Sequence, residues 1–200
     1  MTMHRLALFA SGGGSNVQAI FDYHRALGAS TPFAPALVLS DRVRAGALER
    51  AERHGVAHAR IEAPADGPAL HGLLEQHGIT LIALAGYLKF IPTALTTHWR
   101  GRIVNVHPSL LPKFGGAGMY GHRVHDAVIA AGERQSGATV HFVDDVYDRG
   151  AVIAQARVRV LDGDTSDTLA ARVLRAEHAL YPRVIHALAL GLVTLDADGC

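Results

Sequence analysis

The residues with the clearest chemical potential are Asn105 and His107, which stand in the apolar, β-branched stretch I-V-N-V-H at 103–107. This composition predicts a buried strand that ends before Pro108, because proline has no amide hydrogen to give to a sheet. Side chains two residues apart on a strand point to the same face, so the two groups would converge. Together they could hold and protonate a developing oxyanion. The alternative for an isolated N-x-H pair is a turn asparagine and a histidine satisfied at a strand end.

A second candidate is the sequence S-G-G-G-S-N at 11–16, which follows the apolar stretch 6–10. A glycine-rich turn between a strand and a helix lets backbone amides face an anion, and a side chain at Gly14 would keep that anion away. The dinucleotide fingerprint does not fit, because Val17 stands where its third glycine should be, and no Lys-Ser or Lys-Thr follows as in a P-loop. A tight turn without a ligand is one alternative. Asp41, past the second apolar stretch, could bind a ribose, so a non-catalytic nucleotide-binding module is another.

A third candidate is a carboxylate among Asp144, Asp145 and Asp148, which follow the β-rich stretch 137–143. A carboxylate beside His107 would favour the imidazolium and raise the pKa of the ring, so that the ring could donate a proton to an oxyanion. Three acids within five residues are also typical of a solvated loop. The residue types alone do not choose among them.

Longer strings around these residues resemble the folate-dependent formyltransferases. The matching segments, between Gly12 and Pro182, are G-S-N at 14–16, L-A-G-Y at 84–87, N-V-H-P-S-L-L-P at 105–112 and E-H-A-L-Y-P at 177–182. The resemblance implies that Asn105, His107 and Asp148 are catalytic, with Asp148 adjusting the histidine.

The same resemblance implies two substrate subsites. The acceptor would lie against Gly14, Ser15, Asn16, Gly86 and Glu177, with its phosphate at the glycine loop and its amino group near Glu177. The pterin would lie against Leu88, Lys89, Phe90, Ile91, Asn105, Val143, Asp144, Asp145, Val146 and Tyr147.

Two positions depart from the family pattern. Lys89 stands where arginine is common, and lysine cannot make a planar bidentate contact. Leu174 stands where the family has a polar or basic residue near the phosphate. The neighbouring Arg175 would face about 100° away on an ideal helix.

The phosphate-loop match and the length of 200 residues fit the branch of the family that uses glycinamide ribonucleotide as acceptor. The resemblance then implies direct transfer of the formyl group from 10-formyltetrahydrofolate, as co-substrate, to the acceptor amine in purine biosynthesis. It implies no metal and no covalent enzyme intermediate. A deformylase, in which water replaces the amine, is the alternative within the family. We expect one domain over residues 1–200, without the extra domains of the deformylase or the tRNA enzyme.

Composition limits the partners. The formal net charge of +1 and the absence of a basic run argue against a nucleic-acid partner. The 13 histidines are scattered, and the single cysteine, Cys200, excludes an intramolecular disulfide and a Cys-rich zinc site. The apolar stretches are too short to span a membrane. We therefore expect a cytoplasmic protein with small-molecule substrates, and the sequence leaves a homodimer open.

The elements that must position these residues alternate along the chain. Strands are expected at 6–10, 36–40, 57–61, 80–85 and 103–107, and helices from 17, over 44–54 and over 70–76. This alternation predicts an α/β, doubly wound, mostly parallel and Rossmann-like sheet, with its site at the carboxyl ends of the strands.

The last part of the chain predicts a different arrangement. The strands 139–143 and 151–160 are joined by a linker too short for a helical crossover, so an antiparallel hairpin is expected. The glycine-rich loop 113–121 is expected to be a mobile flap before a helix at 122–132. A long final helix should run over 165–190, with Ser166 or Thr168 as its cap and Pro182 kinking or dividing it.

Overall fold

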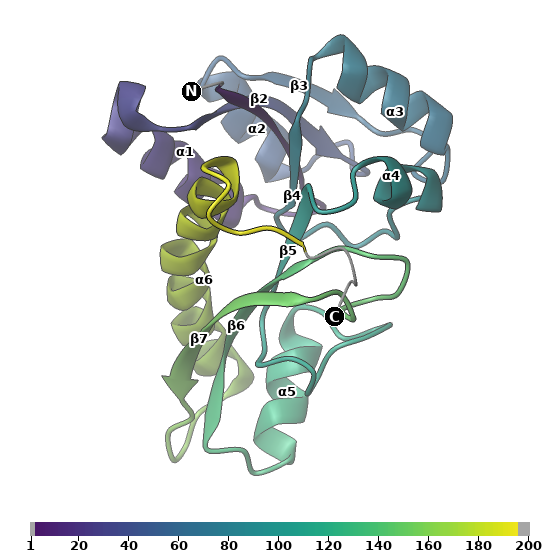
Figure 1. Ribbon diagram of the computed structural model, residues 1–200. Helices are drawn as coiled ribbons and strands as arrows, with labels where there is room; N and C mark the ends of the chain where they lie inside the picture. The colour runs from purple at the N-terminus through teal and green to yellow at the C-terminus, as the bar shows by residue number, and fades with distance from the viewer. Residues whose placement is uncertain (1–2, 196–200) are drawn as a thin grey trace.

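A seven-stranded sheet with the order β3-β2-β1-β4-β5-β6-β7 forms the centre of the protein (Figure 1). The computed structural model describes residues 3–195, so Cys200 lies outside the described part. Strands β1 to β5 run parallel, β6 is antiparallel to β5, and β7 is antiparallel to β6. The predicted fold class and the C-terminal hairpin are therefore confirmed. The strands are β1 His4–Phe9, β2 Phe33–Ser40, β3 Ala57–Arg60, β4 Leu81–Leu84, β5 Ile103–His107, β6 Gln135–Phe142 and β7 Val152–Arg159.

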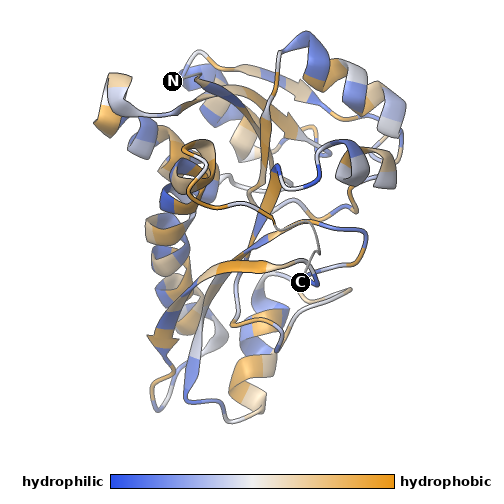
Figure 2. Cartoon of the chain, viewed as in Figure 1, coloured by the Kyte–Doolittle hydropathy of each residue, from blue (hydrophilic) through white to orange (hydrophobic). Residues whose placement is uncertain are grey.

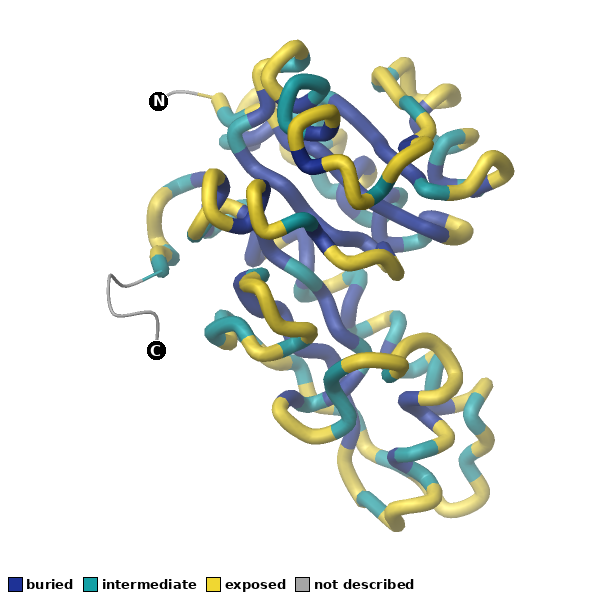
Figure 3. The backbone as a smooth tube through the Cα atoms, turned by 90° about the vertical axis from the view of Figure 1, so that its right-hand side faces the viewer, coloured by how far each residue is buried: buried dark blue, intermediate teal, exposed yellow. Residues whose placement is uncertain are grey.

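Helices cover both faces of the sheet, which is why the central strands are mostly apolar and buried (Figures 2 and 3). The helices are α1 Ser15–Leu27, α2 Gly46–Arg53, α3 Gly67–Gln76, α4 Thr93–His98, α5 His122–Ala130 and α6 Ser166–Ala189, with a short 3-10 helix η1 Gly28–Ser30. In β1, Leu6 and Leu8 pack into one core with α1, α2 and α6, whereas Ala7 and Phe9 pack into a second core with α3 and α4. Among residues 3–195, none of these helices combines the length and the apolar character needed to cross a membrane.

The final helix α6 differs from expectation at two points. Its N-cap is Thr165, which accepts a hydrogen bond from the amide of Thr168 and returns one from its own amide to the Thr168 hydroxyl, so the expected cap at Ser166 or Thr168 is wrong. Pro182 lies inside an unbroken helix and does not divide it. The neighbouring Tyr181 connects this part of α6 to the sheet, because its buried hydroxyl lies 3.0 Å from the carbonyl oxygens of both Leu84 and Val104.

The carboxyl ends of β1, β4 and β5 lie side by side in the sheet. The amide of Ser11, just after β1, donates to the carbonyl of Gly86, just after β4, at 2.9 Å. This arrangement brings the glycine loop, the segment after β4 and the Asn105–His107 pair to one edge. Helix α4 was not predicted, because its six residues are too few to show a helical period.

Candidate active site

A cavity of about 480 Å³ opens at this edge of the sheet. It lies between the strand ends, α5, α6 and the loops that follow β4, β5 and β6. The structure brings most of the predicted site residues together in its lining: Asn16, Gly86, Leu88, Lys89, Phe90, Ile91, Asn105, His107, Val143, Asp144, Val146, Tyr147, Asp148 and Glu177. Gly14, Ser15 and Asp145 lie outside the lining. The carboxylate of Asp145 instead accepts a hydrogen bond from the hydroxyl of Thr96 in α4.

Asn105, His107 and Asp148 meet at the floor of the cavity, together with His141. The antiparallel register of β5 and β6 places Asn105 opposite His141, and the Asn105 Nδ2 atom lies 3.1 Å from His141 Nε2. The Asp148 carboxylate lies between the two histidines, 3.4 Å from His107 Nδ1 and 3.5 Å from His141 Nε2. Sequence reasoning missed His141, because its place beside Asn105 depends on the register of the hairpin.

The pKa of His107 is lowered from its ordinary value of 6.5, chiefly by burial. Asp148 and the carbonyl of Phe114 act in the opposite direction, but at 4% exposure the cost of burying the charged ring is larger. The expectation of a His107 pKa above its free value is therefore wrong. Burial raises the pKa of Asp148, but the hydrogen bond with His141 and the charge of His107 outweigh it, so this pKa falls below 3.8. At neutral pH the carboxylate is ionised.

The orientation of the His107 ring involves the loop after β5. His107 Nε2 lies 2.8 Å from the carbonyl oxygen of Phe114, and because a carbonyl only accepts, this nitrogen carries a hydrogen. Nδ1 faces the carboxylate of Asp148, so both ring nitrogens face acceptors, an arrangement that only the imidazolium satisfies fully. Phe114 has a left-handed backbone with φ of 57°, and the amide of Gly116 donates to Asp148 at 2.9 Å. The loop 113–121 thus closes against His107 and Asp148, and its predicted mobility stays a prediction.

The glycine loop before α1 is shaped by its packing on α2. Gly14 has a φ of 73° and is the N-cap of α1, and a Cβ atom there would lie 2.7 Å from the Cα atom of Ala47. Glycine is therefore required at this position by the fold, and not by the approach of an anion as expected. Gly13 is exposed and has open space around it. Arg50 donates from Nε to the Gly13 carbonyl at 2.8 Å and places a positive charge beside the loop, which the sequence did not indicate.

Asn16 and Glu177 connect α1 to α6 at one end of the cavity. Asn16 Nδ2 donates to Glu177 Oε2 at 2.6 Å. Burial raises the pKa of Glu177 to about 7, and the bond from Asn16 opposes that rise. One turn earlier on α6, Leu174 lines the cavity, whereas Arg175 is exposed outside it. Neither residue therefore supplies a positive charge to the side of the cavity that α6 forms.

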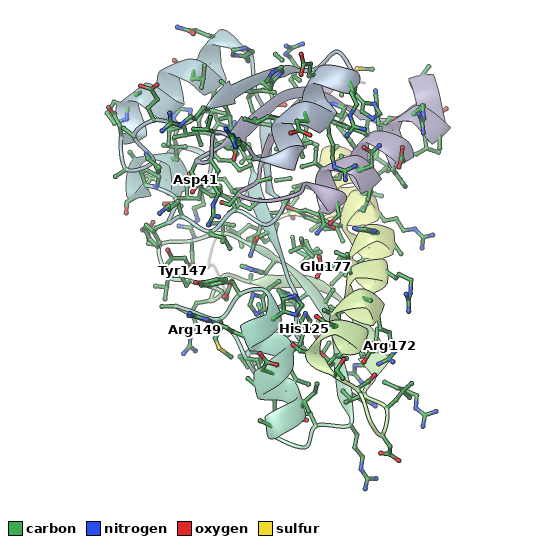
Figure 4. All side chains as sticks on the ribbon, turned by 180° about the vertical axis from the view of Figure 1, so that it is seen from behind. Asp41, His125, Tyr147, Arg149, Arg172 and Glu177 are labelled. Carbon is green, nitrogen blue, oxygen red and sulfur yellow. The ribbon has the colours of Figure 1, made fainter. Side chains whose placement is uncertain are left out.

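The candidate metal ligands and the candidate ribose-binding acid both lie outside the lining of this cavity. Within residues 3–195, the groups with metal-ligand spacing are His71, Glu75 and His98, whose ligand atoms lie within 4.8 Å of one another on α3 and α4, outside the cavity lining. Asp41 also lies outside the lining, apart from Glu177 (Figure 4), which removes the support for a nucleotide-binding module at this cavity.

Comparison with known proteins agrees with the fold. Residues 4–185 match the formyl transferase family, and the chain belongs to that family. It is 40% identical to a phosphoribosylglycinamide formyltransferase, chloroplastic, of Arabidopsis thaliana over 98% of this chain and 68% of that protein. It is 42% identical to the protein of the same name from Vigna unguiculata, over 98% and 64%, so it spans about two thirds of the length of these relatives. A crystal structure of glycinamide ribonucleotide transformylase 1 from Symbiobacterium toebii superposes with a TM-score of 0.88 at 38% identity, over 98% of this chain and 92% of that one.

Proposed function

We propose that this protein transfers the formyl group of 10-formyltetrahydrofolate to the amine of glycinamide ribonucleotide, and that residues 1–200 form a single domain for this reaction. The observation that carries the proposal is the meeting of Asn105, His107 and Asp148, from two separate segments, at the floor of one cavity. The names of the relatives and of the matching structure support the choice of acceptor.

The geometry supports a direct transfer. The neutral amine of the acceptor attacks the formyl carbon, the new C–N bond forms, the bond to the folate nitrogen breaks, and that nitrogen regains the proton that the amine loses. Asn105 and His107 donate hydrogen bonds to the formyl oxygen as it gains negative charge. His107 Nε2 is engaged by the carbonyl of Phe114 in the free protein, so the loop must release it when the substrate binds. Asp148 faces Nδ1 of this ring and opposes the lowering of its pKa by burial.

The acceptor subsite combines three features. The N-terminus of α1 offers amides to the phosphate, because its N-cap Gly14 has no side chain to satisfy them. Arg50 adds the positive charge that Leu174 does not provide. Glu177, with a pKa raised to about 7, is the carboxyl group that faces the amino end of the acceptor.

Incubation with both substrates tests the proposal by following loss of the formyl group from the folate. We expect turnover that depends on glycinamide ribonucleotide, with Asn105→Ala as the inactive control. Equal turnover with water alone, with release of formate, would contradict the proposal and favour the deformylase. A cytoplasmic location and a homodimer remain predictions, and light scattering at several protein concentrations tests the latter.

A further inference from the structure

His125 is a buried polar residue in the cavity that the proposed reaction does not use. It lies on α5, is 4% exposed and lines the cavity (Figure 4). Among residues 3–195, its Nδ1 atom is buried without a hydrogen-bond partner. Asn16 and Tyr87 in the same lining also have an unpaired buried oxygen, whereas the buried side chains of His107, His141 and Glu177 have partners. A buried polar atom without a partner destabilises the fold, so binding of a ligand at this position would explain why a histidine stands here.

The surroundings of His125 indicate the kind of group it would contact. The part of α6 that lines the cavity one to two turns before Glu177 carries Ala170, Ala171 and Leu174, which offer no polar side chain. Burial lowers the pKa of His125, the neighbouring histidines His122 and His107 lower it further, and Asp126 opposes them. The ring is therefore neutral at pH 7. A neutral imidazole suits an uncharged hydroxyl or amide better than a phosphate.

We infer that His125 forms a hydrogen bond with an uncharged hydroxyl or amide group of the acceptor. The inference rests on the proposed function. The acceptor is favoured over the folate because the segments predicted to hold the pterin, 88–91 and 143–147, follow β4 and β6. His125 instead faces the lining of α6, the helix that carries Glu177 (Figure 4). The alanines on this wall leave room for a ligand, and a turn of the ring about its Cβ–Cγ bond brings a nitrogen to the cavity.

Replacing the ring with an apolar one of similar size tests the inference. In His125→Phe, we expect the KM for glycinamide ribonucleotide to rise by on the order of tenfold, the effect of one lost hydrogen bond. The KM for 10-formyltetrahydrofolate should stay within about twofold. The Tm should be unchanged or higher, because the variant no longer buries an unpaired nitrogen. His125→Asn keeps a polar atom near Nδ1 and should restore much of the acceptor affinity.

His186→Phe is the matched control, because His186 also has a buried, unpaired Nδ1 but lies outside the cavity lining. It should leave both KM values unchanged. An unchanged acceptor KM in His125→Phe, with an active wild type, overturns the inference alone. A lower Tm with both KM values raised equally assigns His125 a structural role and overturns it too. A wild type without acceptor-dependent transfer contradicts the proposed function, and the inference fails with it.

Discussion

Glu177 gives a prediction whose size follows from the structure. Its side chain is buried at 7% exposure, and its pKa rises from 4.5 to about 7. At about 1.4 kcal/mol per pH unit, this shift corresponds to roughly 3 kcal/mol of free energy of unfolding. Because the folded pKa is the higher one, the stabilising contribution is complete below pH 4.5 and is lost as the pH rises to about 7. At pH 8 the ionised carboxylate therefore costs the folded state roughly 3 kcal/mol relative to acid conditions.

Glu177→Gln removes this dependence, since glutamine has the same shape, keeps an oxygen for the Asn16 amide and does not titrate in this range. We expect the free energy of unfolding of the variant, relative to that of the wild type, to rise by roughly 3 kcal/mol between pH 4.5 and pH 8. Urea unfolding at several pH values measures this difference. The same change should weaken acceptor binding, because the carboxylate is lost.

The control for this measurement is Glu62→Gln, which removes an exposed carboxylate. Its difference from the wild type should not change with pH. If the stability difference for Glu177→Gln is the same at pH 5 and pH 8, or favours the wild type at pH 8, the reasoning about burial is refuted.

Four further predictions concern the proposed catalytic groups and the glycine loop. In Asp148→Asn, the pKa of His107 should fall further below 6.5, because the carboxylate that opposes burial is gone, and turnover at neutral pH should drop by roughly a hundredfold. NMR titration of His107 measures the shift, and an unchanged or higher pKa contradicts it. His107→Ala should lower turnover by on the order of a hundredfold or more, and near-normal turnover would remove His107 from the mechanism. Gly13→Val should weaken acceptor binding by about tenfold. The protein should still fold, because the new side chain enters open space. Calorimetry measures the binding of both substrates, and an equal loss of folate binding argues against a phosphate site at this loop. Gly14→Val should lower the Tm, because its side chain meets Ala47 and its φ is 73°.

The sequence determined the features that depend on neighbours along the chain. The period of a strand put Asn105 and His107 on one face, and Pro108 ended that strand. Alternating strands and helices predicted the doubly wound sheet, whose parallel order brings strand ends together. These properties are local, or follow from rules of handedness that hold for all chains of this kind.

Only the tertiary structure decided which groups act together. Of the three neighbouring acids, Asp144 bonds the amide of Val146 and Asp145 bonds Thr96, while Asp148 alone of the three faces His107. The resemblance to known formyltransferases indicated Asp148, but the spacing of the acids did not.

The electrostatics of the site was equally beyond the sequence. From a carboxylate beside His107 we expected a raised pKa for the imidazole ring, but burial lowers that pKa instead. The place of His141 depends on the register of β5 against β6, and the place of Arg50 beside Gly13 depends on the packing of α2. Burial, register and packing arise from residues far apart in the chain, so no local pattern encodes them.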